Sequence, residues 1–222
     1  ICDITGQTRN DIIKYCFENS KRIYISPKIS DIIIRGGTDI NLFDSPLLLC
    51  RNSGLSFEQR LFKRIFDIVV SVIGLIILSP FMLIIAAAIK IDDGGSIIYK
   101  QKRLTINGKE FFVYKFRSMI PNAEKNGVPQ LATGSDSRIT RVGKFLRKCR
   151  LDELPQLFNI IKGDMSVVGP RPERPELTEK YEREMPEFKF RLKVKAGLTG
   201  YAQVTGVYDT TPYDKLKMDL MY

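Results

Sequence analysis

Two neighbouring carboxylates, Asp152 and Glu153, lie just after a basic stretch at residues 147–150. Because Pro155 is tolerated only in the first turn of a helix, we expect a helix to begin near Asp152. Both carboxylates could simply cap that helix, since its start stabilises anionic side chains. Their basic surroundings favour another interpretation, a phosphate bound through Mg²⁺. One carboxylate could then attack phosphorus while the other holds the metal ion.

A single arginine, Arg171, stands between Pro170 and Pro172 and follows Gly169. The glycine permits a sharp turn and the prolines restrict the backbone on both sides of the arginine. A guanidinium held in this way can bind a phosphate through two parallel hydrogen bonds. Taken alone, these residues are equally typical of a proline-rich turn with a surface arginine. Residues 196–204 form a second glycine-bracketed loop, for which a tight structural turn is an alternative.

The composition excludes several kinds of catalytic site. The 222 residues include no histidine, which excludes Ser-His-Asp and Cys-His catalysis and metal sites built on histidine. The four cysteines form no C-x-x-C pair, which argues against a zinc site, and their number is low for a disulfide scaffold, which fits a reducing compartment. A net charge of +10 suits nucleic acid, anionic lipid or phosphate-bearing substrates. No nucleic-acid-binding motif accompanies that charge, so we expect no nucleic-acid partner.

The most apolar part of the chain, residues 68–89, carries no charged side chain. A straight helix of this length would span roughly 33 Å, about one hydrocarbon core of a bilayer. Ser79 and Pro80 interrupt it near the middle. Because proline removes a backbone donor and clashes with the preceding turn, the helix must kink or break there. The Ser79 hydroxyl could satisfy the carbonyl that the proline leaves unpaired.

Basic residues flank this segment on both sides, at 60–64 and at 90–103. A helix that crosses the bilayer would place one basic cluster on the outer face, against the positive-inside rule. A re-entrant helix at about 63–90 that turns at Ser79 and Pro80 would keep both clusters on the cytoplasmic side. An ordinary kinked transmembrane helix is the alternative, and the sequence leaves both open.

The chain as a whole predicts an α+β protein in two parts. Residues 1–52 have the character of the tail of an α/β module, and residues 53–222 form a separate domain with amphipathic helices and short strands. In the first part we expect a helix at 11–17 and buried strands at 22–25 and 31–34. In the second part we expect strands at 96–101 and 109–116, a turn at 106–108, a loop at 120–136 and a helix at 138–147.

Five ordered motifs together resemble a known family. They are Lys-Arg-Ile-Phe-Asp at 63–67, Ser-Pro at 79–80, Tyr-Lys-Phe-Arg-Ser-Met at 114–119, Leu-Asp-Glu-Leu-Pro-Gln at 151–156 and Val-Gly-Pro-Arg-Pro at 168–172. From about residue 57 to 222 the chain is similar to the bacterial sugar transferases, the monotopic polyprenyl-phosphate phosphoglycosyl transferases. The first part resembles the end of the module that larger members carry upstream.

The resemblance implies transfer of a sugar 1-phosphate from a UDP-sugar to undecaprenyl phosphate, with release of UMP. It implies Asp152 as the nucleophile of a phosphosugar-aspartyl intermediate and Glu153 as a ligand of Mg²⁺. It also implies that substrate is bound by Lys115, Arg147, Pro170, Arg171, Pro172 and Asp219.

The same resemblance implies a re-entrant membrane helix and a cytosolic catalytic domain at the bacterial inner membrane. Lipid of that membrane and a second copy of the chain in a homodimer are the expected further partners. An alternative for the whole chain is a non-catalytic membrane adaptor that binds anionic lipid. That alternative gives no reason for Asp152 and Glu153 to lie among basic residues.

Overall fold

The structure, a computed structural model, describes residues 5–42, 45–50, 55–120, 136, 138–206 and 210–222. The chain divides into two compact units, Ile1–Cys50 and Arg51–Tyr222. The predicted loop at 120–136 falls almost wholly outside the described residues.

The first unit contains two helices and a hairpin. Helix α1 (Gly6–Glu18) is joined to α2 (Ile29–Arg35) by an ion pair between Arg9 and Asp31 at 2.7 Å. Strands β1 (Thr38–Leu42) and β2 (Ser45–Leu49) pair antiparallel. Neither helix contains a buried residue.

Two strand predictions in this unit are wrong, whereas the helix predicted at 11–17 is confirmed within α1. Residues 22–25 have no regular structure, and 31–34 belong to α2. A short isoleucine run fits a buried strand or a helix equally well. Here a hydrogen bond at the start of the segment favours the helix, because the Asp31 carboxylate accepts the N–H of the N-cap residue Lys28 at 2.8 Å.

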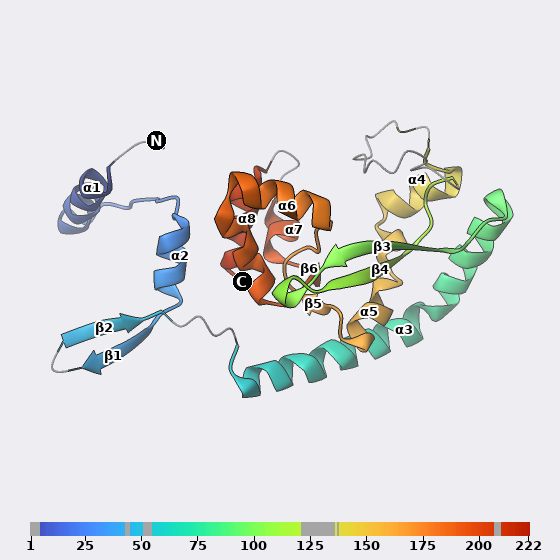
Figure 1. The fold of residues 1–222 in the computed structure, drawn as a ribbon, viewed down its shortest axis with the longest axis horizontal. Coiled ribbons are helices and arrows are strands. Elements are labelled where there is room, and N and C mark those ends of the chain that lie inside the picture. The colour runs from blue at the N-terminus through green and yellow to red at the C-terminus, as the bar shows by residue number, and fades with distance from the viewer. Residues whose placement is uncertain (1–4, 43–44, 51–54, 121–135, 137, 207–209) are drawn as a thin grey trace. The chain divides into compact units, whose positions relative to one another are not determined.

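The second unit is built on one long helix, α3 (Phe57–Asp93), which is long and apolar enough to cross a membrane. It extends beyond both ends of the predicted segment and does not break at Pro80, although Figure 1 shows it as a bent ribbon. The Ser79 hydroxyl donates to the Ile76 carbonyl at 2.9 Å. This is the carbonyl four residues before Pro80, which explains how the helix continues through the proline.

The first half of α3 is joined to the rest of the unit by polar contacts. They involve Lys63, Arg64 and Asp67, the charged residues of the motif at 63–67. Lys63 Nζ donates to Val168 O at 3.0 Å, Arg64 donates to Ile160 O at 2.6 Å and Ile161 O at 2.7 Å, and Asp67 Oδ1 accepts from Ser166 Oγ at 3.0 Å and Val167 N at 2.9 Å. Asp67 is thus a buried charged residue on a predominantly apolar helix.

The second half of α3 is joined to the same unit by apolar packing. Ile85 and Ile89 form a buried cluster with Phe116 and Leu146. An ion pair between Asp93 and Arg117 closes this end. The inner side of the bent helix therefore contacts one domain near both of its ends (Figure 1). Its other side exposes large apolar side chains, among them Phe62, Ile73, Ile77, Phe81 and Ile84.

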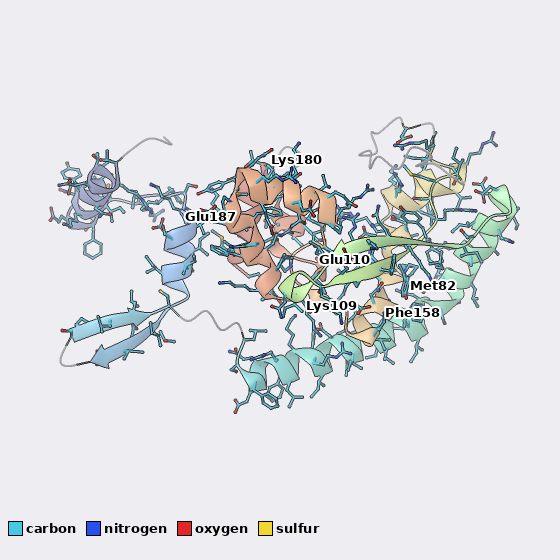
Figure 2. All side chains as sticks on the ribbon, viewed as in Figure 1. Met82, Lys109, Glu110, Phe158, Lys180 and Glu187 are labelled. Atoms are coloured by element: carbon cyan, nitrogen blue, oxygen red, sulfur yellow. The ribbon has the colours of Figure 1, made fainter. Side chains whose placement is uncertain are left out.

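A hairpin and two short parallel strands form the centre of the second unit. Strands β3 (Ile98–Leu104) and β4 (Glu110–Phe116) pair antiparallel across the turn η1 (Ile106–Gly108), which confirms the predicted strands and turn. Figure 2 shows Lys109 and Glu110 at the tip of this hairpin. Strands β5 (Ser166–Val168) and β6 (Gly197–Thr199) pair parallel. The main core joins β4 to α5 (Gln156–Lys162) through Phe111, Val113, Leu157, Ile160, Met165 and Ala196.

Short helices surround this centre. α3 contacts α5, and Figure 2 shows Met82 and Phe158 on these two helices. The helix predicted at 138–147 is found as α4 (Arg141–Lys148), which Thr140 caps by accepting the Gly143 N–H at 2.9 Å. The other elements are η2 (Leu151–Glu153), α6 (Pro175–Glu184), η3 (Pro186–Lys193), α7 (Tyr201–Thr205) and α8 (Pro212–Leu220).

Candidate active site

Asp152 and Glu153 lie in the short 3-10 turn η2, between α4 and α5. Helical structure therefore begins near Asp152 as predicted, but as a 3-10 turn, and the α-helix α5 begins only at Gln156 with Pro155 as its N-cap. Arg150 enters the turn with a left-handed backbone, at φ 55°. This conformation ends the helical backbone of α4, and the turn that follows brings the Glu153 carboxylate to β4 and to the loop after β5.

The Glu153 carboxylate joins three segments that are far apart in the sequence. Its Oε1 accepts from Lys115 Nζ of β4 at 2.8 Å and from Arg171 Nη2 of the loop after β5 at 3.1 Å. Only 13% of the Glu153 side chain is exposed. Burial raises the pKa of Glu153, but Arg171 and Lys115 outweigh it and hold that pKa at about 2. Glu153 is therefore anionic at neutral pH.

Asp152 differs from its neighbour because it forms no salt bridge with any residue that the structure describes. Burial raises the pKa of Asp152 above its usual value, and the charge of Lys115 opposes that rise. Burial also lowers the pKa of Lys115, although Glu153 opposes this shift. The site thus contains one carboxylate that is neutralised by two cations and a second that is partly desolvated. A partly desolvated carboxylate is the better nucleophile of the two.

Arg147 is the basic residue that α4 brings to this turn. Its Nε donates to Ser118 Oγ at 2.8 Å, and its charge lowers the pKa of Asp152. Ser118 lies just after β4 and its main chain contacts α4 so closely that a Cβ on Gly143 would lie 2.1 Å from the Ser118 carbonyl oxygen. This close contact determines where Arg147 lies relative to Asp152.

The loop around Arg171 packs against the second glycine-bracketed loop. A Cβ on Gly197 would lie 2.1 Å from Gly169 N, and a Cβ on Gly200 would lie 2.2 Å from Gly169 O. Pro170 and Pro172 are buried, whereas the Arg171 side chain is 42% exposed. The two glycine loops that were predicted separately therefore pack backbone against backbone. This packing places Arg171 beside Glu153.

The structure does not bring Asp219 directly to Asp152 or Glu153. The Asp219 side chain on α8 is 3% exposed, and its Oδ2 lies 2.8 Å from Arg191 Nη2. Arg191 in turn donates to the Arg171 carbonyl at 2.8 Å. Burial raises the pKa of Asp219, and the charge of Arg191 opposes the rise. Asp219 therefore reaches the site only through Arg191.

The carboxylates of the site fit a magnesium ion that takes part of its ligands from the substrate. Among the residues that the structure describes, no group of three or more acidic or cysteine side chains is arranged to hold a metal ion. Mg²⁺ bound with a phosphate substrate commonly uses one or two carboxylates and takes its other ligands from phosphate and water. Asp152 and Glu153 can supply that number of carboxylates, while Glu153 would share its charge with Lys115 and Arg171.

Sequence reasoning missed several residues that position the site. Asn159 is fully buried, accepts the Tyr114 N–H at 2.9 Å and donates to the Phe112 carbonyl at 2.8 Å, which joins α5 to the strand that carries Lys115. Arg191 was missed as well. An asparagine within an apolar helical run is a usable signal, because a buried amide needs specific partners. The surroundings of Arg191 in the sequence contain no comparable signal.

The sequence profile of the family described as bacterial sugar transferase matches residues 58–222. A UDP-N-acetylgalactosamine-undecaprenyl-phosphate N-acetylgalactosaminephosphotransferase of Aeromonas hydrophila is 43% identical over 163 residues, which are 72% of this chain and 38% of that protein. A UDP-glucose:undecaprenyl-phosphate glucose-1-phosphate transferase of Klebsiella pneumoniae is 43% identical over 190 residues, 85% of this chain and 39% of that protein.

An undecaprenyl-phosphate galactose phosphotransferase of Salmonella typhimurium is 42% identical, over 75% of this chain and 38% of that protein. The chain thus spans less than two fifths of the length of these three curated relatives. The family profile covers the whole of α3, apart from its first residue, and every residue of the Asp152, Glu153 and Arg171 cluster. The chain belongs to the bacterial sugar transferase family.

Proposed function

We propose that this chain transfers a sugar 1-phosphate from a UDP-sugar to undecaprenyl phosphate, with Asp152 as the nucleophile. One observation carries the proposal: Glu153 is paired with Lys115 at 2.8 Å and with Arg171 at 3.1 Å, while Asp152 beside it forms no salt bridge to a described residue. The relatives named above act on undecaprenyl phosphate by their names. Family membership and this division between the two carboxylates support the same reaction.

The reaction has two steps that balance without an external acid or oxidant. A carboxylate oxygen of Asp152 attacks the phosphorus that carries the sugar, and the bond from that phosphorus to the bridging oxygen of the diphosphate breaks. UMP leaves with that oxygen. A phosphate oxygen of undecaprenyl phosphate then attacks the same phosphorus and displaces the Asp152 carboxylate. The product is undecaprenyl diphosphate sugar, and Asp152 is restored.

The charges of the site suit this reaction because an anion must approach an anionic diphosphate. The charges of Lys115 and Arg147 act on the attacking carboxylate, and Arg171 contacts Glu153 beside it. These three cations can stabilise the charge of the phosphoryl group in the transition state. Arg171 extends from its buried loop with 42% of its side chain exposed, as a phosphate-binding arginine requires. Glu153 would hold Mg²⁺ together with the substrate phosphates, and the metal would supply further charge screening there.

The position of α3 supports a membrane helix that does not cross the bilayer. Polar contacts from Lys63, Arg64 and Asp67 and apolar packing of Ile85 and Ile89 join both halves of the helix to one domain. A domain that contacts both ends of an apolar helix has to lie on one side of the membrane. We therefore favour the re-entrant arrangement at the cytoplasmic face of the inner membrane, with the exposed apolar side of α3 in lipid.

The whole protein's further properties stay predictions. The first unit, Ile1–Cys50, is expected to be the end of an upstream module, and a homodimer is expected from the resemblance.

Release of UMP from a panel of UDP-sugars tests the proposal. The chain in nanodiscs with undecaprenyl phosphate and Mg²⁺ should release UMP with one or a few sugars, and chelation should stop the release. Asp152→Asn should abolish turnover, whereas Asp214→Asn on α8 serves as a matched control and should retain it. Intact mass measured without acceptor should reveal a sugar phosphate on the wild-type chain alone.

A folded, membrane-bound wild-type chain that releases no UMP from any sugar would overturn the enzyme proposal. Binding of that chain to anionic vesicles would then favour the membrane-adaptor alternative. Turnover that survives in Asp152→Asn would instead remove Asp152 from the role of nucleophile and leave the reaction class intact.

A further inference from the structure

The loop that carries Arg171 has an unusual shortage of donors, because two of its residues are prolines and have no N–H. The Gly169 N–H donates to Thr199 O at 2.8 Å, and the other contacts that position the loop are made through its carbonyl groups. Four consecutive carbonyls accept hydrogen bonds from outside the loop: Pro170 O from Gly197 N at 2.8 Å, Arg171 O from Arg191 Nη2 at 2.8 Å, Pro172 O from Arg103 Nη1 at 3.0 Å and Glu173 O from Leu104 N at 3.0 Å.

Two of these four donors are guanidinium groups, that of the buried Arg191 and that of the mostly buried Arg103, and they form one charge network. Arg191 lies 2.8 Å from Asp219 and 3.7 Å from Glu173, and Arg103 lies 3.9 Å from the other oxygen of Glu173. The Arg191 side chain is 5% exposed and that of Arg103 is 14% exposed. The Arg191 guanidinium also stacks on the buried Phe188 ring, at 4.9 Å from its centroid.

We infer that Arg191 and Arg103 are positioning residues, which hold the main chain of residues 169–173 so that the Arg171 guanidinium reaches Glu153 and the substrate phosphate. Asp219 and Glu173 hold the two arginines in turn. The kinetic part of this inference rests on the proposed function, whereas the structural part does not.

The shape of the guanidinium explains why arginine is used at position 191. One planar group donates to the Arg171 carbonyl while the same nitrogen meets Asp219 and the other terminal nitrogen faces Glu173. A lysine has a single nitrogen and cannot replace the two terminal nitrogens that reach these partners. Arg191→Lys therefore keeps the charge in the buried network and loses the hold on the loop.

A double-mutant cycle distinguishes positioning from a general structural role. Arg191→Lys should lower kcat/KM for UMP release about 10-fold in the wild-type background, but less than about 2-fold when Arg171 is already alanine. A residue that acts only through Arg171 has nothing left to position in that background. Arg103→Lys should behave in the same way. Arg183→Lys on α6, whose side chain is 82% exposed, is the matched control and should change neither background.

Hydrogen exchange in the full chain gives a second readout that needs no activity. Arg191→Lys and Arg103→Lys should speed deuterium uptake in residues 168–173 and at Leu104, whose N–H donates to the Glu173 carbonyl, while uptake in β4 stays as in the wild type. This measurement decides the question by itself where the Arg171→Ala background is too slow to assay.

Equal losses of kcat/KM in both backgrounds would overturn the inference, as would activity loss without faster exchange in the loop. A wild-type chain that releases no UMP while exchange in the variants rises would refute the proposed function and leave the positioning role in place.

Discussion

The turn that carries Asp152 and Glu153 is shaped mainly by residues next to it, whereas the loop that carries Arg171 is held by residues far away. Arg150, with its left-handed backbone, and Pro155, which caps α5, bracket the turn in the sequence. The Arg171 loop depends instead on Gly197 and on two arginines that are 68 and 20 residues distant in the chain. The turn that carries Asp152 and Glu153 can therefore be recognised from a short motif, whereas the distant contacts that hold the Arg171 loop cannot.

The two regions also differ in what a substitution should do. Removing a distant contact should displace the Arg171 loop and leave the turn intact, and a change in the turn should act in reverse. Gly197→Ala tests the loop and Arg150→Gly tests the turn, while Asn159→Ala and Lys115→Gln test β4, which carries the lysine that contacts Glu153.

The largest effect is expected from Gly197→Ala. Its Cβ would lie 2.1 Å from Gly169 N and 2.4 Å from Gly169 O, so the backbone of one loop must shift. Overpacking of this kind should cost about 3 kcal/mol in the free energy of unfolding, measured in mild detergent. Gly74→Ala on α3 is the control, because its Cβ would meet only Leu157 at 3.5 Å. Similar stability of both variants would mean that the two glycine loops do not pack as described.

Asn159→Ala should have the next largest effect. It leaves the Tyr114 N–H and the Phe112 carbonyl without their partner, which should cost about 2 kcal/mol in the free energy of unfolding. Asn159→Asp keeps an acceptor for Tyr114 but no donor for Phe112, so it separates the two hydrogen bonds. If these variants lost UMP release but kept the wild-type free energy of unfolding, Asn159 would not stabilise the contact between α5 and β4 as described.

A smaller effect is expected on the pH dependence of UMP release. Asp152 must be anionic to attack, so kcat/KM should fall as the pH drops through the raised pKa of Asp152. Lys115 opposes that rise, and Lys115→Gln should therefore raise the pKa of Asp152 further and move the acid limb to higher pH. Lys102→Gln, on the neighbouring strand and 57% exposed, should leave the limb in place. A shift to lower pH would show that Lys115 does not stabilise the Asp152 anion.

The smallest effect is expected from Arg150→Gly. Arg150 adopts φ 55°, a conformation that glycine adopts without steric cost. Because glycine also loses more chain entropy on folding, the net gain in the free energy of unfolding should be only about 0.5 kcal/mol. Arg150→Val should be destabilised in the same assay, since a β-branched residue tolerates this backbone poorly. Equal stability of the two variants would show that the turn does not need the left-handed backbone.

The sequence by itself determined the parts of this protein whose signals are local. The apolar run of α3, the hairpin of β3 and β4 with its turn, and the pairing of Asp152 with Glu153 among basic residues all lie within short stretches. Pro170 and Pro172 likewise identified Arg171. Periodicity, turn residues and neighbouring charges are properties of adjacent positions, which is why each of these features could be predicted.

Only the tertiary structure decided which of these groups meet. It paired Glu153 with Lys115 and Arg171, left Asp152 without a salt bridge to any described residue, and paired the buried Asp219 with Arg191. It also kept α3 continuous through Pro80 and joined both halves to one domain. Contacts between residues many positions apart leave no periodic signal, because they depend on how whole elements pack against one another.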